Sequence, residues 1–360
     1  MHVDLDYFYA QCEENRNPDI RGKPVVVCVY SGRTEESGVV STANYPARKY
    51  GVKAGIPITR AKKLLESVNT TFLPMNRPLY EQVSDRIMEI LRSYADSFEK
   101  MGIDEGYLDI STKTSGDFKR AETLAVDVKQ DILAKEQITC SIGIAPNKLV
   151  AKIASDVRKP NGLTIVRPEH VGSFLEQMPV SKIPGVGRKA EDKLTQIHVE
   201  TILQLLTVNP SILVETFGKS LGTYLVRAAR GEDDDPVKER DQPTQLSRIA
   251  TLKQNTREHP DIQPVLDELT KSVTNKLKEK NMKCKSIAII AILTDLSTHT
   301  KSKTLEAPTS DATVLKQNAN ELMAQFLESS PSAIIRRAGV RLSDLSMPAG
   351  QTDISKFLTA

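Results

Sequence analysis

The chain has 360 residues, of which 39% are hydrophobic and 26% charged, enough for two or three domains with apolar cores. No apolar run reaches the roughly 20 residues of a membrane span, and the chain opens on an acid-bearing strand instead of a signal peptide. A cytoplasmic protein with no membrane partner is therefore expected. The four cysteines have no Cys-x-x-Cys spacing, so neither a zinc site nor a disulfide framework is indicated.

The net charge of +3 is small, but it is unevenly distributed. Residues 243–344 contain 15 Lys and Arg against 11 Asp and Glu, a net of +4, so the rest of the chain is slightly acidic. Phosphate contacts supply most of the non-specific affinity of proteins for DNA. This segment is therefore predicted to hold a DNA backbone.

The chain opens with an apolar run that carries two acids, HVDLDYFYA from His2 to Ala10. Its mixture of β-branched, aromatic and aliphatic residues predicts a strand over residues 1–7. Side chains alternate along a strand, so Asp4 and Asp6 are expected on one face and Leu5 on the other.

Strands and helices alternate over residues 8–165, which predicts an α+β fold. Helical stretches are also expected within residues 8–74. The other expected elements are a strand at Val25–Val29, a turn near Ser31–Gly38, a helix at Tyr80–Tyr94, a strand at Ile103–Ile110, a helix at Ala121–Lys135 and a strand at Thr139–Ile144.

The adjacent acids Asp104 and Glu105 interrupt one of these strands. Neighbouring strand residues point to opposite faces, so both acids can serve one site only at a strand end, turn or bulge, which Gly102 and Gly106 permit. Together with Asp4 they suit a divalent metal, because hard oxygen ligands can converge on two ions roughly 4 Å apart. Solvated acids at strand ends are the alternative.

From Arg167 to Gly231 the pattern is helical, with proline and glycine breakers. The segment Ile183–Gly187 (IPGVG) has the form of a helix-hairpin-helix turn, in which Gly185 and Gly187 let backbone amides approach a phosphate. A simple turn between two helices is the alternative. Glu232–Pro243 follows, with clustered charges and two prolines that oppose compact packing, and it is predicted to be a linker.

A second α/β pattern follows the linker. On its last strand Arg337 and Arg341 share one face while Ala338, Val340 and Leu342 share the other, as expected for a sheet with one phosphate-facing side. The expected elements are strands at Leu246–Leu252, Ile287–Leu293 and Ile334–Leu342 and helices at Pro264–Lys280 and Ala312–Glu328.

These motifs, in this order and spacing, resemble those of the Y-family translesion DNA polymerases, in the DinB or DNA polymerase IV branch and especially its archaeal members. The resemblance covers nearly the whole chain. It is carried by VDLDYFY (Val3–Tyr9), TANYPAR (Thr42–Arg48), GVKAGIPI (Gly51–Ile58), IDEGYLDI (Ile103–Ile110), SIGIAPNKLVA (Ser141–Ala151), KPNG (Lys159–Gly162) and IPGVG (Ile183–Gly187).

The resemblance implies a multidomain α+β protein in which a small fingers module is inserted into a ferredoxin-like palm. The thumb is a helical domain with a helix-hairpin-helix, and the little finger is a separate α/β domain that grips DNA. The implied boundaries are 1–7 and 75–165 for the palm, 8–74 for the fingers, 166–231 for the thumb, 232–242 for the linker, 243–344 for the little finger and 345–360 for a tail.

The resemblance also implies the chemistry, which is template-directed addition of dNTPs to a primer 3′ end by two-metal-ion nucleotidyl transfer. Asp4, Asp104, Glu105 and the backbone carbonyl of Leu5 would bind two Mg²⁺ ions, with Mn²⁺ able to substitute. Asp6 is not the usual direct ligand in this family. The implied contacts to the nucleotide phosphates are Tyr45, Arg48 and Lys159.

In resembling enzymes an aromatic residue at the place of Tyr9 leaves no room for a ribose 2′-hydroxyl, which predicts dNTP over rNTP. An ordinary core aromatic is the alternative for Tyr9. The resemblance further implies an error-prone monomer without a proofreading exonuclease. It would act on primer-template DNA in damage tolerance, and it would be nucleoid-associated when bound there.

The tail QTDISKFL resembles a PCNA-interacting motif, with Leu358 in place of the usual second aromatic. In a short helical turn Gln351, Ile354, Phe357 and Leu358 fall together, so a PCNA-type sliding clamp is the expected partner. A frayed terminus is the alternative.

Two other classes of protein share parts of this pattern. A nucleotide cyclase on the same palm would retain the acids but has no need of a helix-hairpin-helix and a basic C-terminal domain. A non-catalytic DNA scaffold would retain those parts but not Asp4, Asp104, Glu105 and Tyr9 together. Primer extension with Mg²⁺ and dNTPs distinguishes the three.

Overall fold

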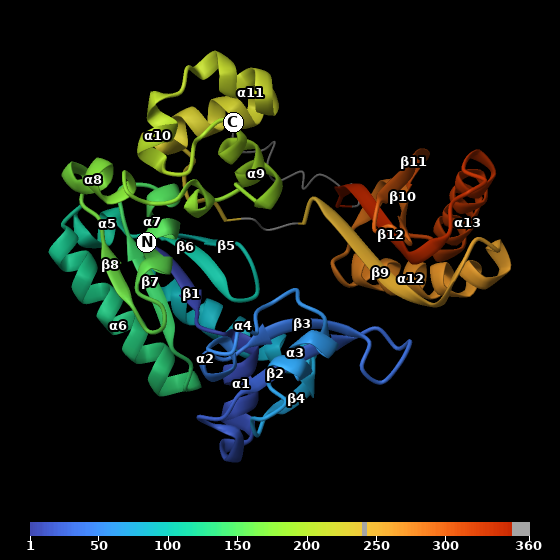
Figure 1. Cartoon of the computed structure of the whole chain (residues 1–360), viewed down its shortest axis with the longest axis horizontal. Helices are drawn as coiled ribbons and strands as arrows, with labels where there is room; N and C mark the ends of the chain where they lie inside the picture. Colours follow the sequence, from blue (N-terminus) through green and yellow to red (C-terminus); the bar gives the residue numbers. More distant parts are fainter. Residues whose placement is uncertain (240–242, 348–360) are drawn as a thin grey trace, which may run out of the picture. The chain divides into compact units, whose positions relative to one another are not determined.

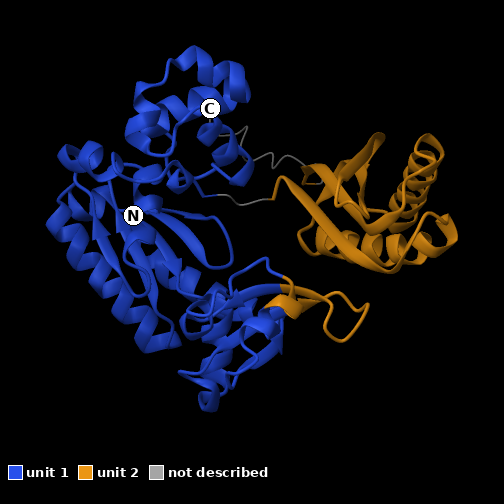
Figure 2. Cartoon of the chain, in the orientation of Figure 1, with its two compact units in different colours: residues 1–28, 40–56, 61–240 blue, residues 29–39, 57–60, 241–360 orange. Residues whose placement is uncertain are grey.

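The computed structural model describes residues 1–239 and 243–347. The chain divides into two compact units, one with residues 1–28, 40–56 and 61–240 and the other with residues 29–39, 57–60 and 241–360 (Figure 2). Among the described residues, no helix is both long and apolar enough to cross a membrane.

The first unit is built on a five-stranded sheet with the strand order β5-β6-β1-β7-β8. The middle strand β1 pairs antiparallel with β6 and with β7. Val3 and Leu5 on β1 point into the core, so His2 and Asp4 lie on the opposite face. The strands are β1 His2–Leu5, β5 Ser97–Lys100, β6 Glu105–Asp109, β7 Cys140–Ile144 and β8 Leu163–Ile165.

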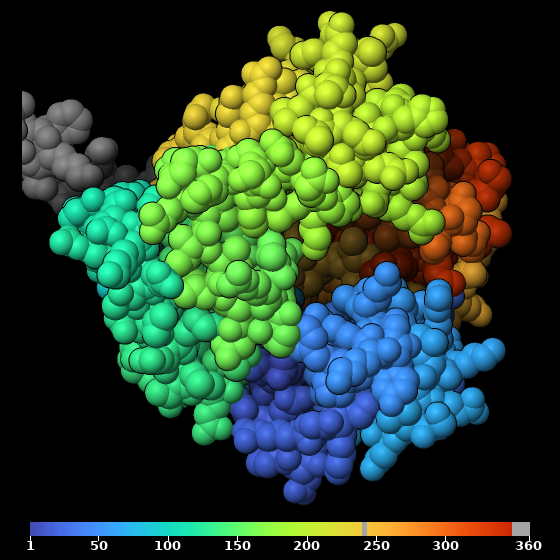
Figure 3. Space-filling view, turned by 60° about the vertical axis from the view of Figure 1, so that its left-hand side comes forward, coloured from blue at the N-terminus to red at the C-terminus, as the bar shows by residue number. Residues whose placement is uncertain are grey.

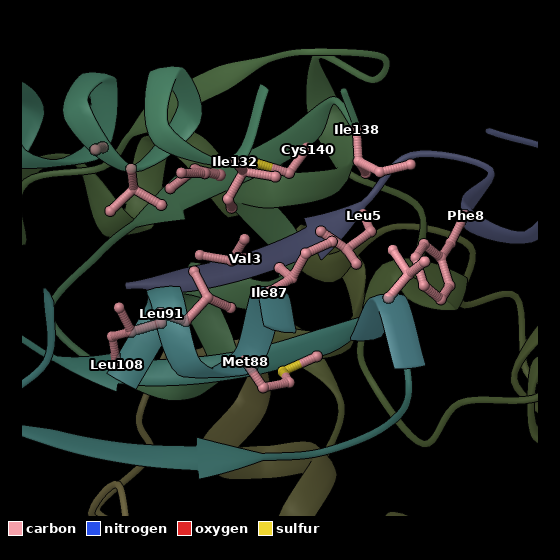
Figure 4. Packing of buried hydrophobic residues seen from close by; sticks show 14 of the residues in the cluster. Val3, Leu5, Phe8, Ile87, Met88, Leu91, Leu108, Ile132, Ile138 and Cys140 are labelled. Atoms are coloured by element: carbon pink, nitrogen blue, oxygen red, sulfur yellow. The ribbon is translucent and has the colours of Figure 1, made fainter. Parts of the chain in front are cut away.

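Helices α4 (Arg77–Tyr94) and α6 (Phe118–Glu136) lie along one face of this sheet (Figure 1). Each helix starts at a side-chain cap, provided by Asn76 for α4 and by Asp117 for α6. Figure 4 shows apolar side chains of both helices packed against those of β1 and β6, which forms the core beneath the candidate site. The short helix α5 (Ser111–Thr114) connects β6 to α6.

Helix α7 (Lys148–Val157) covers part of the other face, starting at the cap Asn147. A glycine on the neighbouring strand permits its close approach, because a Cβ on Gly143 would lie 2.0 Å from the carbonyl oxygen of Ala151. The apolar side of α7 joins the core of the following helical segment. In Figure 3 these residues form one continuous stretch of the surface, coloured green to yellow. No strand forms between Arg167 and Gly231, a range that the structure describes in full, as predicted. The helices there are α8 Val171–Leu175, α9 Arg188–Gln196, α10 Ile202–Thr207 and α11 Pro210–Ala229.

Residues 8–74 include a three-stranded sheet of order β3-β2-β4. The first strand of the chain is shorter than predicted: it ends at Leu5, and α1 begins at Phe8 after Tyr7 adopts a left-handed backbone with φ 33°. The elements are α1 Phe8–Arg16, β2 Val25–Tyr30, β3 Gly38–Ala43, α2 Tyr45–Arg48, α3 Ile58–Leu64 and β4 Thr71–Pro74.

The second unit has a four-stranded antiparallel sheet with the order β11-β10-β12-β9. Helices α12 and α13 pack against one face, where Ala338, Val340 and Leu342 are fully buried. The elements are β9 Gln245–Thr256, α12 His259–Glu279, β10 Lys283–Leu293, β11 Thr298–Thr309, α13 Ala312–Ser329 and β12 Ile335–Ser346.

Two predictions for this unit were wrong in detail. Helix α12 starts at His259 and not at Pro264, because Pro260 occupies its first turn and Pro264 is accommodated inside the helix. Strand β11 was missed, since its sequence THTKSKTLEAPT is mostly polar and exposed and carries no apolar alternation.

The expectation that the segment after Gly231 avoids compact packing was also wrong for residues 232–239. Asp233 accepts a hydrogen bond from the backbone N–H of Leu149 at 3.0 Å, and the carbonyl of Val237 accepts one from Ser97 at 3.2 Å. Glu239 pairs with Arg92 at 2.8 Å. The charged side chains that suggested a free linker instead attach these residues to the sheet domain.

Candidate active site

Asp4 and Glu105 lie directly opposite each other on β1 and β6. Asp104 immediately precedes β6, and its carbonyl accepts a hydrogen bond from the backbone N–H of Leu5 at 2.8 Å. The three predicted acids thus lie at one strand end. This was the expected position, because neighbouring residues within a strand, such as Asp104 and Glu105, would point to opposite faces. Gly106 has a packing role, since a Cβ there would lie 2.8 Å from the ring of Phe98.

Asp4 is held by a lysine from the loop after α7. The Nζ of Lys159 lies 2.7 Å from Oδ1 of Asp4 and 2.8 Å from Oδ1 of Asp156. Burial raises the pKa of Asp4 to about 6 even though Lys159 acts in the opposite direction. Burial also raises the pKa of Asp104. Both carboxylates are thus partly withdrawn from water, and a bound cation would offset that cost.

Glu105 has protein partners of its own. Nε2 of His2 lies 3.4 Å from its carboxylate, and Lys152 of α7 forms an ion pair with the same oxygen. Hydrogen bonding from His2, followed by Lys152, lowers the pKa of Glu105 to about 2. His2 is itself fixed by Ser155, which lies 2.8 Å from Nδ1, and burial lowers the pKa of this histidine to about 4.

The donor set suits Mg²⁺, because it consists of the carboxylate oxygens of three acids and a backbone carbonyl oxygen close to them, and Mg²⁺ prefers hard oxygen ligands. The side chain of Leu5 points into the core, so only its backbone could contribute. Within residues 1–239 and 243–347, no group of three or more His, Cys, Asp and Glu side chains is already gathered as a metal-ligand set. Lys159 and Lys152 instead hold Asp4 and Glu105.

Two of the predicted phosphate ligands, Tyr45 and Arg48, come from α2. Asn44 caps this helix by accepting a hydrogen bond from the N–H of Ala47, and its amide donates to the buried Glu14 at 2.7 Å. The guanidinium carbon of Arg48 lies 4.8 Å from the centre of the Tyr45 ring. Burial raises the pKa of Tyr45, and the carboxylate of Asp6 acts in the same direction. The ring of Tyr45 lies 5.3 Å from that of Tyr7, so α2 lies near the end of β1.

Tyr9 lies in the first turn of α1 and is partly exposed. Its ring stacks on that of Tyr80, with centroids 4.4 Å apart and planes 13° from parallel. Burial raises the pKa of Tyr9, as does the nearby carboxylate of Asp104. The ring is therefore packed on α4 of the sheet domain.

The predicted glycine turn lies between the 3-10 turn Val180–Lys182 and α9. Gly185 has φ +87°, a backbone conformation that favours glycine, while Gly187 is the N-cap of α9 with an ordinary extended backbone. The hydroxyl of Tyr224 on α11 donates to the carbonyl of Pro184 at 2.6 Å and fixes the turn.

In the second unit, Arg337 and Arg341 occupy β12 positions facing away from the helices. Arg337 pairs with Ile292 and Thr251, and Arg341 pairs with Ala288 and Ser247, all on the open face of the sheet. The predicted separation of faces on this strand is confirmed. The candidate clamp residues Gln351, Ile354, Phe357 and Leu358 lie outside the described residues.

The sequence did not identify His2, Lys152 or the partners of Asp6. His2 had a detectable signal, since a polar residue two positions before Asp4 in a strand shares its face. Lys152 had none, because its pairing with Glu105 depends on how α7 packs on the sheet. Asp6 lies beyond the end of β1. Its carboxylate nevertheless accepts a hydrogen bond from Ser141, which is the register partner of Asp4, so Asp4 and Asp6 lie on the same side of the sheet.

Comparison with known families covers most of the chain. Residues 3–156 match the impB/mucB/samB family, and residues 243–355 match the C-terminal domain of that family. Residues 181–233 match the thumb domain described for DNA polymerase-iota.

Full-length relatives and solved structures agree. DNA polymerase IV of Nitrosopumilus maritimus is 45% identical over 358 residues, covering 99% of this chain and 98% of that protein, and DNA polymerase IV of Methanosarcina acetivorans is 44% identical over 363 residues, with the same two shares. The solved structure of a Y-family DNA polymerase chimera of Dbh and Dpo4 has a TM-score of 0.90 at 39% identity, covering 96% of this chain and 99% of that one. An insertion ternary complex of Dbh DNA polymerase has a TM-score of 0.70 at 39% identity, with the same coverage.

The sheet with paired acids, the glycine-linked helices and the separate α/β domain together define a polymerase with palm, thumb and little-finger domains. More narrowly, the chain belongs to the Y family of DNA polymerases, in its DNA polymerase IV branch.

Proposed function

We propose that this protein is a template-directed, translesion DNA polymerase that adds dNTPs to a primer 3′ end by two-metal-ion nucleotidyl transfer, without a proofreading exonuclease. The observation that carries the proposal is the pairing of Asp4 with Glu105 across β1 and β6, with Asp104 at the strand end and Lys159 beside them. The relatives named DNA polymerase IV support the reaction class.

Asp4, Asp104, Glu105 and the Leu5 carbonyl are the groups that would hold two Mg²⁺ ions, with Mn²⁺ as a substitute. When bound, these ions lower the pKa of the primer hydroxyl and neutralise charge on the triphosphate. Lys152 and His2 contact the Glu105 carboxylate and favour its charged form.

The triphosphate is proposed to bind between α2 and the loop after α7. Arg48 offers a planar fork of donors, Tyr45 offers a hydroxyl, and Lys159 offers an ammonium group that in this structure lies at Asp4. Tyr9, stacked on Tyr80, would lie under the deoxyribose and exclude a 2′-hydroxyl.

Duplex DNA is proposed to contact the glycine turn at Gly185 and Gly187 and the open face of β12 at Arg337 and Arg341. We further propose that the protein is a cytoplasmic monomer that joins the nucleoid on binding DNA, with a PCNA-type clamp bound at residues 351–358. Without an editing site, accuracy depends on the closing of a small fingers module, and low fidelity is expected.

Primer extension tests the proposal directly. The full chain is incubated with a primer-template, Mg²⁺ and each dNTP singly, and the expected result is incorporation directed by the template base. Production of a cyclic nucleotide from ATP would indicate the cyclase alternative. DNA binding without either reaction would indicate a scaffold.

A further inference from the structure

Asp6 is a fully buried acid to which the proposed mechanism assigns no role. Its carboxylate accepts three hydrogen bonds, from the hydroxyl of Ser141 at 2.7 Å, the hydroxyl of Thr139 at 2.9 Å and the backbone N–H of Asn161 at 2.7 Å. A carboxylate has about four acceptor sites, so both of its oxygens are already largely committed to the protein. This argues against metal ligation and for a structural connection.

The connection reaches the loop that carries Lys159. Asn161, two residues beyond that lysine, has φ 53°, a left-handed conformation that needs support from its surroundings. Gly162 next to it donates to the hydroxyl of Ser141 at 3.2 Å, and its carbonyl accepts from Lys129 at 3.2 Å. Asp6 and Ser141 thus bind two consecutive backbone amides of the loop.

The other end of the connection is equally fixed. The backbone N–H of Asp6 donates to the carbonyl of Thr139 at 3.0 Å, and the amide of Gln11 donates to the carbonyl oxygens of both Asp6 and Thr139. Asp6 is therefore rigid with respect to the end of β1, where Asp4 lies. The loop is tied to the same strand end that carries the first acid.

We propose that Asp6 is a positioning residue that fastens the Lys159–Gly162 loop to the end of β1 and thereby sets the affinity for the triphosphate of the incoming nucleotide. The inference rests on the proposed polymerase function, in which Lys159 binds phosphate. Asp6 itself touches neither substrate nor metal. It acts through Lys159, whose ammonium group is held 2.7 Å from Asp4.

The central test is a double-mutant cycle with Asp6→Asn and Lys159→Ala in the full chain. Asparagine keeps the size of Asp6 but weakens its hold on the Asn161 amide. We expect Asp6→Asn to raise the dNTP dissociation constant in single-turnover incorporation by roughly tenfold, with less than a threefold change in the maximal rate. In the Lys159→Ala background the same change should have less than a twofold effect. Equal effects in both backgrounds would overturn the proposal.

A second variant guards against misfolding. Thr139→Val removes one donor to Asp6 without changing volume greatly, and we expect a smaller increase in the dNTP dissociation constant that is again absent in the Lys159→Ala background. Asp117→Asn, at the exposed cap of α6, is the matched control and should leave that constant unchanged. A Thr139→Val effect that persists without Lys159 would contradict the proposed route.

Hydrogen exchange separates this proposal from the polymerase assignment, because it needs no turnover. In substrate-free protein, Asp6→Asn should accelerate exchange at the amides of Asn161 and Gly162 at least tenfold while leaving α4 and α6 protected. Unchanged exchange would overturn the connection even in an active polymerase. A shift in the Mg²⁺ concentration for half-maximal incorporation, with unchanged exchange, would instead identify Asp6 as a metal ligand.

Discussion

The five-stranded sheet of the first unit and the four-stranded sheet of the second unit have related designs but use charge in opposite ways. Each has two helices on one face, with β1 inside the first sheet and β12 inside the second. On the other face of the first sheet, which α7 partly covers, the acids Asp4 and Glu105 are paired with specific lysines, and burial or hydrogen bonding shifts their pKa values. On the second, Arg337 and Arg341 lie among small hydroxyl and apolar residues.

This difference indicates what each surface can do. Positioned, partly buried charges suit a reaction in which atoms must be held in one geometry, and loss of one charge leaves its partners uncompensated. Basic residues on an open sheet face suit a polyanion that can bind in many registers, where each charge adds a small, salt-dependent increment. Substitutions on the first sheet should therefore be severe and local, and those on the second mild and additive.

The largest effect is expected for the acids of the first sheet. Asp104→Ala or Glu105→Ala should reduce single-turnover dNTP incorporation by about a thousandfold or more, equivalent to about 4 kcal/mol, because the metal ions lose a ligand. Binding of primer-template DNA, measured by anisotropy, should change less than about threefold because these acids are not phosphate contacts. Near-normal incorporation by either variant would refute the metal assignment, and the exposed cap variant Asp117→Ala supplies the control.

A second effect on the same sheet concerns sugar selection. Tyr9→Ala opens the space a 2′-hydroxyl needs, so the kcat/KM ratio for dCTP over CTP opposite guanine should fall at least roughly tenfold, or about 1.4 kcal/mol. Tyr9→Phe keeps the ring stacked on Tyr80 and should retain the ratio. If Tyr9→Ala lowers only the melting temperature, the ring is a packing residue.

The sequence predicted the acids of the first sheet more completely than their partners. Asp4, Asp104 and Glu105 could be located because acids in apolar strands are unusual, and the strand-end requirement for Asp104 and Glu105 was correct. The partners could not be located in the same way. Glu105 meets Lys152 across 47 residues of sequence, through the packing of α7, and no local pattern encodes that contact.

The same limit explains the errors in the fold. Helices and buried strands with clear apolar periodicity were found near their observed positions, as for α13 and β10. The edge strand β11 has no buried stripe to reveal it, and its pairing with β10 is a property of the assembled sheet. Tyr7 ends the first strand early through a backbone conformation that its aromatic side chain does not predict.

The arginines of the second sheet should show the milder behaviour. Arg337→Ala with Arg341→Ala should weaken DNA binding several-fold at low salt and reduce the slope of log K against log salt by about 0.9 for each phosphate that these side chains neutralise. The maximal rate of incorporation at saturating DNA should stay within about twofold of the unsubstituted protein, because neither arginine is proposed to bind the metal ions or the nucleotide. Lys271→Ala with Lys280→Ala, on the helical side, is the control for charge alone, and an equal change in slope would show that the open face is not special.

The smallest effect on basal chemistry is expected outside both sheets. Phe357→Ala with Leu358→Ala should leave synthesis on a bare primer unchanged, because the tail supplies no group to the reaction, but should abolish stimulation by the cognate sliding clamp. Clamp binding raises the effective concentration of a weakly processive enzyme at the primer end, so the loss should appear only when clamp is loaded. Calorimetry with clamp and a peptide of residues 347–360 measures the interaction alone. Absence of binding heat at concentrations on the order of tens of micromolar would contradict the predicted clamp interaction. Slower synthesis by the variant on a bare primer would indicate that the tail contacts DNA instead.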